Sequence, residues 1–293
     1  MFRGTYTALV TPFRDDAVDA DAFERLIEAQ IAGGVSGIVP VGSTGESPTL
    51  SHEERHQLIE LAVKFARQRC QVIAGTGSNS TRDAIAHTRA AQELGVDGAL
   101  LVAPYYNKPS QEGLFRHFHA IAGATSLPLV LYNIPGRCAV DIAADTVVRL
   151  ARACANIVSI KEASGSVDRV SELVARVPEG FTVLSGDDSL TLPFLAVGAV
   201  GVVSVASNLF PAEISELVRA FCEGEVEKAQ RLHRKFLPLF KDLFIEPNPV
   251  PAKTALAWRG AMANEVRLPL CEITAQNATR LRATLDAFEK KNG

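Results

Sequence analysis

The sequence predicts a (β/α)8 TIM barrel, of class α/β, followed by a small C-terminal helical appendix. Short apolar runs rich in β-branched residues recur at intervals of about 20–35 residues, the length of a βα unit, and amphipathic stretches lie between them. The runs are continuously apolar, as expected of parallel strands that are buried on both faces. The eight expected strands are Tyr6–Val10, Gly37–Val41, Gln71–Ala74, Gly98–Val102, Pro128–Tyr132, Ile157–Ile160, Thr182–Leu184 and Gly201–Val205.

The stretches between these strands have the apolar spacing of helices. In the first, Phe23 and Leu26 lie three residues apart on one helical face. Ser51, followed three residues later by Glu54, indicates a capping box at the start of the second. The eight expected strands alternate with helical stretches without interruption, which favours a closed barrel over an open doubly wound sheet. The first strand also continues into Thr11-Pro12-Phe13 and not into the G-x-G-x-x-G of a dinucleotide-binding fold.

The strand pattern ends near residue 224. We therefore expect a catalytic barrel domain over residues 1–224 and a helical domain over residues 225–293, which would offer a surface for subunit assembly. The expected helices are Glu225–Phe244, Ala252–Ala263 and Thr274–Lys291, with Pro247, Pro249 and Pro251 in a stiff connector.

The composition predicts a cytoplasmic metabolic protein. The formal net charge is −3 and no Lys/Arg run occurs, which argues against nucleic acid or an anionic membrane as partner. We find no basic leader followed by an apolar segment, and no run of about 18 apolar residues. The five cysteines form no C-x-x-C pair, which favours reduced thiols.

The sequence has no residues with the spacing of a metal site. The adjacent acids Asp187 and Asp188 cannot easily face one ion together, and we expect them to cap the helix that follows. The six histidines lie in expected helices and form no H-E-x-x-H pair. We therefore expect neither a metal nor a cofactor.

Reactive side chains of such a barrel lie at the carboxyl ends of the strands and in the loops that follow. The second strand is followed by Gly42-Ser43-Thr44-Gly45-Glu46-Ser47. Its glycines permit a tight turn whose amides and hydroxyls suit a carboxylate or a phosphate, although an ordinary βα turn explains the same residues equally well. The spacing of a P-loop is absent.

Three of the four tyrosines, Tyr105, Tyr106 and Tyr132, lie at the ends of two adjacent expected strands. A phenol transfers protons when neighbouring hydroxyls stabilise the phenolate. Tyrosines at a barrel rim more often pack with their hydroxyls in water. Expected clustering with Ser43 and Thr44 favours the catalytic interpretation.

Lys161 directly follows the apolar strand Ile157–Ile160 and is expected at the catalytic end of the barrel. In a dry pocket its pKa would fall, and the neutral amine would become a nucleophile. Position alone favours a lysine that extends to solvent. Arg137, in a Pro-Gly loop, has the planar guanidinium that binds a carboxylate, but most loop arginines make only weak surface pairs.

Together these residues resemble the dihydrodipicolinate synthase/N-acetylneuraminate lyase family. The resemblance extends from Ala8–Phe13 to Leu268–Leu270. Its most distinctive pieces are Gly42–Ser47, Ala74–Gly77, Pro104–Ser110, Tyr132–Arg137, Ile160–Ala163, Leu184–Asp188 and Glu246–Pro249.

The resemblance implies a lyase that forms a Schiff base between Lys161 and pyruvate. It implies that Tyr132 donates and accepts protons, with Ser43 and Tyr106 completing a hydroxyl relay. In this family the residue that matches Tyr106 comes from a neighbouring subunit, so the resemblance implies at least a dimer. The family also suggests a homotetramer, built as a dimer of dimers.

The resemblance also assigns the substrate contacts. Thr44 and the backbone at Val203 would hold pyruvate, and Arg137 would bind the carboxylate of L-aspartate 4-semialdehyde. The implied reaction condenses these two substrates to 4-hydroxy-tetrahydrodipicolinate, in lysine and diaminopimelate biosynthesis.

An allosteric lysine site follows from the same resemblance. His52, Asn79 and Tyr105 match the pattern of members that lysine inhibits, and Asp83 stands where those members often have glutamate. They also often have histidine at the position of Arg55. Feedback inhibition by lysine is therefore left open.

Three alternatives remain at this point. Ser43 stands where synthases usually have threonine, and Ser-Thr-Gly-Glu also occurs in sugar-acid aldolases. A pyruvate-dependent aldolase, lyase or dehydratase acting on a keto-deoxy sugar acid or sialic acid is therefore the main rival, although Arg137 and Glu246–Pro249 favour the condensation. The lack of a ligand cluster speaks against a metal-dependent lyase. Lys161 and the tyrosines speak against a non-catalytic pyruvate-binding regulator.

Overall fold

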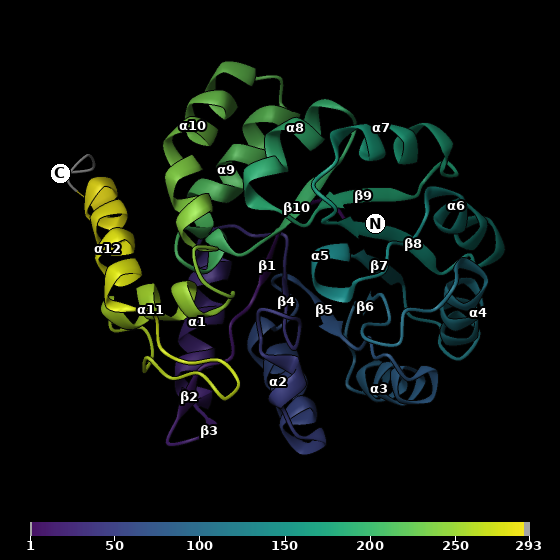
Figure 1. The fold of residues 1–293 in the computed structure, drawn as a ribbon, viewed down its shortest axis with the longest axis horizontal. Helices are drawn as coiled ribbons and strands as arrows, with labels where there is room; N and C mark the ends of the chain where they lie inside the picture. The colour runs from purple at the N-terminus through teal and green to yellow at the C-terminus, as the bar shows by residue number, and fades with distance from the viewer. Residues whose placement is uncertain (1, 290–293) are drawn as a thin grey trace.

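The computed structural model describes residues 2–289 and shows a closed barrel of parallel strands, in the order β1-β10-β9-β8-β7-β6-β5-β4 (Figure 1). The predicted fold class is confirmed. The barrel strands are β1 Gly4–Ala8, β4 Gly37–Val39, β5 Gln71–Gly75, β6 Gly98–Val102, β7 Leu129–Asn133, β8 Ile157–Glu162, β9 Thr182–Ser185 and β10 Gly201–Ser204.

Helices cover the outside of the barrel. They are α1 Ala20–Ala32, α2 His52–Ala66, α3 Thr81–Glu93, α4 Gln111–Ala122, α6 Ala144–Ala153, α7 Val167–Arg176, α8 Thr191–Ala196 and α9 Pro211–Cys222. A four-residue helix, α5 Pro135–Cys138, lies in the loop after β7. The small hairpin of β2 Phe13–Arg14 and β3 Ala17–Val18, which the sequence did not predict, follows β1.

Side chains just before the helices define where they begin. Ser51 and Glu54 form the predicted capping box, in which the Ser51 hydroxyl accepts from the Glu54 amide and the Glu54 carboxylate accepts from the Ser51 amide. Four other helices, α1, α3, α4 and α7, begin with a single cap, in which a side chain accepts from a backbone amide three residues later; these caps are Asp19, Ser80, Ser110 and Ser166.

The end of β8 differs from the prediction in a way that matters for function. The sequence placed Lys161 after a strand that ended at Ile160, whereas the strand continues through Lys161 and Glu162. In the register with β7, Lys161 is paired with Tyr132 and Glu162 with Asn133. Backbone pairing to a neighbouring strand therefore extends β8 beyond its apolar run and fixes the position of the lysine.

The C-terminal part consists of α10 Val226–Asp242, α11 Val250–Trp258 and α12 Ala275–Glu289. Figure 1 shows α12 at one edge of the molecule, beside α11 and away from α4 and α6. Helix α10 packs against α9, and α12 packs against both α10 and α11. The expected helix Thr274–Lys291 extends beyond the described residues at its end. The boundary at residue 224 between two domains stays a prediction.

The predicted helix Ala252–Ala263 was wrong at both ends. The helix begins at Val250, because Pro251 lies in the first turn, where a missing amide hydrogen costs nothing. It ends at Trp258, before Gly260, whose φ of +70° cannot continue a helix. The stiff proline connector is correspondingly shorter than expected. Within residues 2–289, no helix combines the length and apolar character needed to cross a membrane.

Candidate active site

Lys161 and Tyr132 lie side by side on adjacent strands at the carboxyl end of the barrel. Lys161 is 6 % exposed, and its Nζ lies 4.1 Å from the centroid of the Tyr132 ring. Gly186, just after β9, leaves room for the lysine, since a Cβ there would lie 3.1 Å from Lys161 Cε and 2.7 Å from Ala163 Cβ. The prediction that Lys161 is buried at the catalytic end is confirmed, and the alternative of a solvent-exposed lysine is wrong.

Burial sets the protonation of both groups. The pKa of Lys161 falls from 10.5 to about 7, chiefly because burial removes the hydration of its ammonium; the nearby Asp188 opposes the fall and Arg137 adds to it. Burial raises the pKa of Tyr132 to about 12, against the opposing effects of Arg137 and a hydrogen bond with Ser43. Near neutral pH the lysine is therefore substantially a neutral amine, beside a phenol that keeps its proton.

Asp188 has a role that the sequence analysis missed. Only Asp187 caps, by accepting from Ser189 N at 2.8 Å. The buried Asp188 carboxylate instead accepts from the Ser204 hydroxyl and from the amides of Val205 and Ala206, at 2.9 and 3.0 Å. It thereby ties the end of β9 to the end of β10, and burial raises its pKa to about 6. The G-D-D sequence after a strand was the only available signal.

Thr44 and Arg137 are joined by Asn248 from the segment before α11. Asn248 Nδ2 donates to Thr44 Oγ1 at 2.9 Å, and Arg137 Nη2 donates to the Asn248 carbonyl at 3.2 Å. Thr44 is buried, whereas Arg137 is exposed to solvent. Val203, in β10, is buried. The structure thus brings the predicted substrate-binding residues Thr44 and Arg137 to one end of the barrel.

A buried ion pair fixes the loop that carries Thr44. Lys253 Nζ in α11 lies 2.6 Å from Glu46 Oε1, and the side chains are 0 % and 1 % exposed. The second carboxylate oxygen accepts from Arg267 N at 3.0 Å. The Lys253 ammonium also lies 4.3 Å from the centroid of the Phe13 ring. Sequence reasoning missed this pair because its members are more than 200 residues apart.

Tyr106 does not join the other hydroxyls within one chain. Its side chain is 89 % exposed, and its φ of +73° lies in the left-handed region that residues other than glycine seldom adopt. The Tyr105 carbonyl accepts from Asn79 Nδ2 at 3.2 Å. The expected clustering of all three tyrosines with Ser43 and Thr44 is therefore wrong for a single chain, and only Tyr132 has a hydrogen bond with Ser43.

The chain is similar to known proteins over nearly its whole length. The model of the Dihydrodipicolinate synthetase family matches residues 1–288.

The chain belongs to the dihydrodipicolinate synthetase family.

A 4-hydroxy-tetrahydrodipicolinate synthase from Endomicrobium trichonymphae is 51 % identical, over 98 % of this chain and 99 % of that protein. The structure of the synthase from Methylacidiphilum fumariolicum SolV superposes with a TM-score of 0.98 at 59 % identity, covering 99 % of this chain and 97 % of that one. A dihydrodipicolinate synthase from Acinetobacter baumannii, solved in complex with pyruvate, has a TM-score of 0.95 at 44 % identity, covering 98 % of each chain.

Two of the residues considered for an allosteric site in this family member line a separate cavity. The cavity, of about 300 Å³, lies between α2 and α3 and includes His52 and Asp83 in its lining. Arg55 also lines it and donates to the Ser47 carbonyl. Asn79 is in contact with the backbone of Tyr105 in the loop after β6. Among residues 2–289, no three His, Cys, Asp or Glu side chains gather as metal ligands would.

Proposed function

We propose that this protein is a Schiff-base lyase that condenses pyruvate with L-aspartate 4-semialdehyde to 4-hydroxy-tetrahydrodipicolinate, in lysine and diaminopimelate biosynthesis. The observation that carries the proposal is the buried Lys161, with a pKa of about 7, packed against the Tyr132 ring. The family and its 51 % identical relative support the choice of reaction.

The reaction begins at the lysine. Neutral Lys161 attacks the ketone carbon of pyruvate, and the carbinolamine loses water when Tyr132 supplies a proton to the departing hydroxyl. The resulting iminium draws electrons from the adjacent carbon, which loses a proton to the Tyr132 phenolate and becomes an enamine. This covalent electron sink supplies the activation that the condensation requires, so the proposed mechanism uses no cofactor.

The second half forms the carbon–carbon bond and then the ring. The enamine carbon attacks the aldehyde carbon of the semialdehyde, and the new alkoxide takes a proton from the Tyr132 phenol. The amine of the semialdehyde then attacks the iminium carbon and closes the ring. One of its protons passes to the Lys161 nitrogen, which leaves as a free amine, and the other returns to the Tyr132 phenolate. The free amine of Lys161 is therefore restored for the next turnover.

The remaining predicted residues have assigned roles in this proposal. Thr44 and the backbone at Val203 hold the pyruvate carboxylate and keto group, and Arg137 binds the carboxylate of the semialdehyde. Ser43, which has a hydrogen bond with Tyr132, begins the proton relay. Tyr106 completes the relay in a neighbouring copy, a role that its 89 % exposure in the single chain supports.

The role of Tyr106 in a neighbouring copy requires at least a dimer, and by resemblance to the family we propose a homotetramer arranged as a dimer of dimers. We assign the protein to the cytoplasm, in keeping with five cysteines that all remain free thiols.

We also propose that lysine binds near His52, Asn79, Asp83 and Tyr105. Titration of lysine into the protein tests this, and absence of both binding and inhibition would contradict it.

A coupled assay distinguishes the condensation from its main rival. With pyruvate present, we expect turnover of L-aspartate 4-semialdehyde and none of keto-deoxy sugar acids or sialic acid. Preferential turnover of a sugar acid would overturn the assignment of the second substrate but would leave the Schiff base intact. An Arg137→Met variant, assayed in parallel, should lose the preference for the semialdehyde.

A further inference from the structure

A network of buried polar side chains lies on the opposite face of the strands that carry Lys161 and Tyr132. Because successive side chains of a strand point to opposite faces, Glu162 and Asn133 point away from the face that carries Lys161 and Tyr132. Glu162 and Asn133 are both 0 % exposed and are paired in the β7–β8 register. Neither takes part in the chemistry proposed above.

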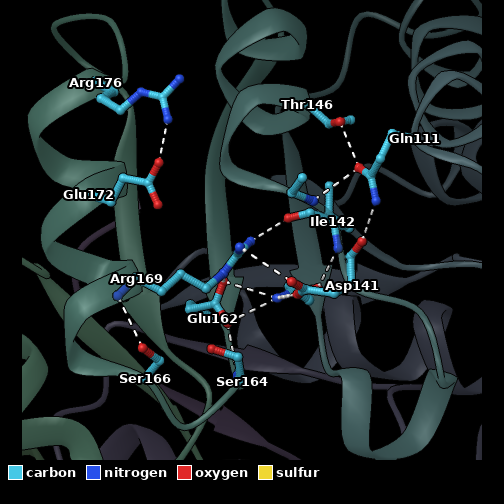
Figure 2. A network of polar contacts seen from close by, with 12 residues as sticks. Gln111, Asp141, Ile142, Thr146, Glu162, Ser164, Ser166, Arg169, Glu172 and Arg176 are labelled. Carbon is cyan, nitrogen blue, oxygen red and sulfur yellow. Dashed lines mark hydrogen bonds and ion pairs between the residues drawn. The ribbon is translucent and has the colours of Figure 1, made fainter.

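The Glu162 carboxylate is surrounded by donors. Asn133 Nδ2 donates to both of its oxygens, at 3.0 and 3.2 Å. Ser164 N donates to Oε1 at 2.8 Å, and Arg169 Nε donates to Oε2 at 2.8 Å. Figure 2 shows Arg169 reaching from α7 to this carboxylate, with Ser164 below it. Each oxygen therefore accepts two hydrogen bonds.

The same residues hold the loop that carries Arg137. Arg169 donates to the Ile142 carbonyl and lies 3.5 Å from Asp141 Oδ2. Asn133 Nδ2 donates to Asp141 Oδ1 at 2.7 Å, and Asn133 Oδ1 accepts from Ile142 N at 3.0 Å. The ends of β7 and β8, the start of α7 and residues 141–142 are thus joined at one point (Figure 2).

A buried charge arranged in this way resists displacement. The side chain of Arg169 is only 12 % exposed, and its guanidinium is the cation paired with Glu162. A fully hydrogen-bonded buried pair tolerates little movement, because any shift leaves a charge or a donor without its partner. Reaction rates in turn depend steeply on the placement of reacting groups.

We propose that Glu162, Asn133 and Arg169 act together as positioning residues, which hold the reactive strand ends and the Arg137 loop in register during the reaction. The inference rests on the proposed Schiff-base function and names the residues that organise its site from outside the barrel.

Glu162→Gln is the sharpest test, because an amide NH2 in place of either oxygen would face two donors. We expect kcat to fall by about 10- to 100-fold, the scale expected for a small misplacement of reacting groups, with KM for pyruvate changed by less than about threefold. The rate of imine formation at saturating pyruvate should fall with kcat. Glu162→Gln combined with Arg169→Met should lose no more than the worse single variant, because the residues act as a unit.

Two control variants change residues of α7, the helix that carries Arg169. Glu172→Gln removes an exposed ion pair with Arg176, visible at the far end of α7 in Figure 2, and should leave kcat unchanged. Leu173→Ala removes a fully buried side chain and should lower the melting temperature while kcat at 25 °C stays near that of the parent.

The outcomes separate positioning from stability. The inference is overturned if folded Glu162→Gln keeps the parent kcat, or if its loss of kcat is matched by Leu173→Ala at equal loss of melting temperature. Should Glu162→Gln fail to fold, Arg169→Lys, which keeps the charge but loses the planar guanidinium, is judged by the same two criteria. If borohydride traps no pyruvate on the parent protein, it is the proposed function that fails.

Discussion

Replacing Lys161 by methionine should stabilise the protein while abolishing its activity. The side chain is 6 % exposed, and burial lowers the pKa of its ammonium from 10.5 in the unfolded chain to about 7. Each unit of difference corresponds to about 1.4 kcal/mol, so protonated Lys161 costs the folded state about 5 kcal/mol below pH 7. Methionine has a similar length and carries no charge.

The effect must depend on pH with a definite sign. The folded-state pKa is below the unfolded one, so the unfolded chain binds more protons between pH 7 and 10.5 and the parent gains stability as pH rises. The advantage of Lys161→Met should therefore fall from about 4 kcal/mol at pH 7 to about 2 kcal/mol at pH 9.

Equilibrium unfolding in denaturant at pH 7, 8 and 9, at one protein concentration, measures this difference. Lys64→Met, which removes an exposed lysine from α2, is the control and should show no such trend. Parallel stability curves for the parent and Lys161→Met across this range would refute the claim that the lysine loses its proton through burial.

Three further substitutions test individual contacts. Tyr132→Phe should lower kcat by about 10²- to 10⁴-fold while pyruvate still binds, because only the phenolic proton is lost; unchanged steady-state turnover would contradict this. Arg137→Met should raise KM for the semialdehyde by about tenfold or more without changing KM for pyruvate, and an equal rise in both would count against a role in carboxylate binding. Glu46→Gln should destabilise the fold by about 3–5 kcal/mol in denaturant unfolding, because it leaves the Lys253 ammonium buried without its carboxylate. Adding Lys253→Met should restore most of that loss, and failure to do so would argue against the unpaired charge as the cause.

The barrel could be predicted because the pattern that marks each of its strands lies within a few consecutive residues of the sequence. Strands buried on both faces must be apolar throughout, so each appears as a short run, as in Gly98–Val102, which forms β6 as predicted. Prediction failed where polar residues continue a strand. Lys161 and Glu162 belong to β8 because β7 supplies their backbone partners, and no periodicity within the segment reveals that pairing.

The candidate site was predictable in part for a related reason. The rule that places chemistry at the carboxyl ends of strands located Lys161, Tyr132 and Ser43. It could not predict contacts between residues that are far apart in the sequence, such as that of Glu46 with Lys253 or of Thr44 with Asn248. The role proposed for Tyr106 requires a second copy of the chain, and in the single chain its side chain is exposed. Neither a local sequence pattern nor one folded chain can therefore test that role.

Reduction with borohydride in the presence of pyruvate, followed by mass mapping, tests the central chemical step most directly. Reduction of the imine should leave one stable adduct per chain, located on the peptide that contains Lys161, and Lys161→Met should show none. Modification of a different lysine, or no modification under conditions of full turnover, would contradict Schiff-base chemistry at this residue.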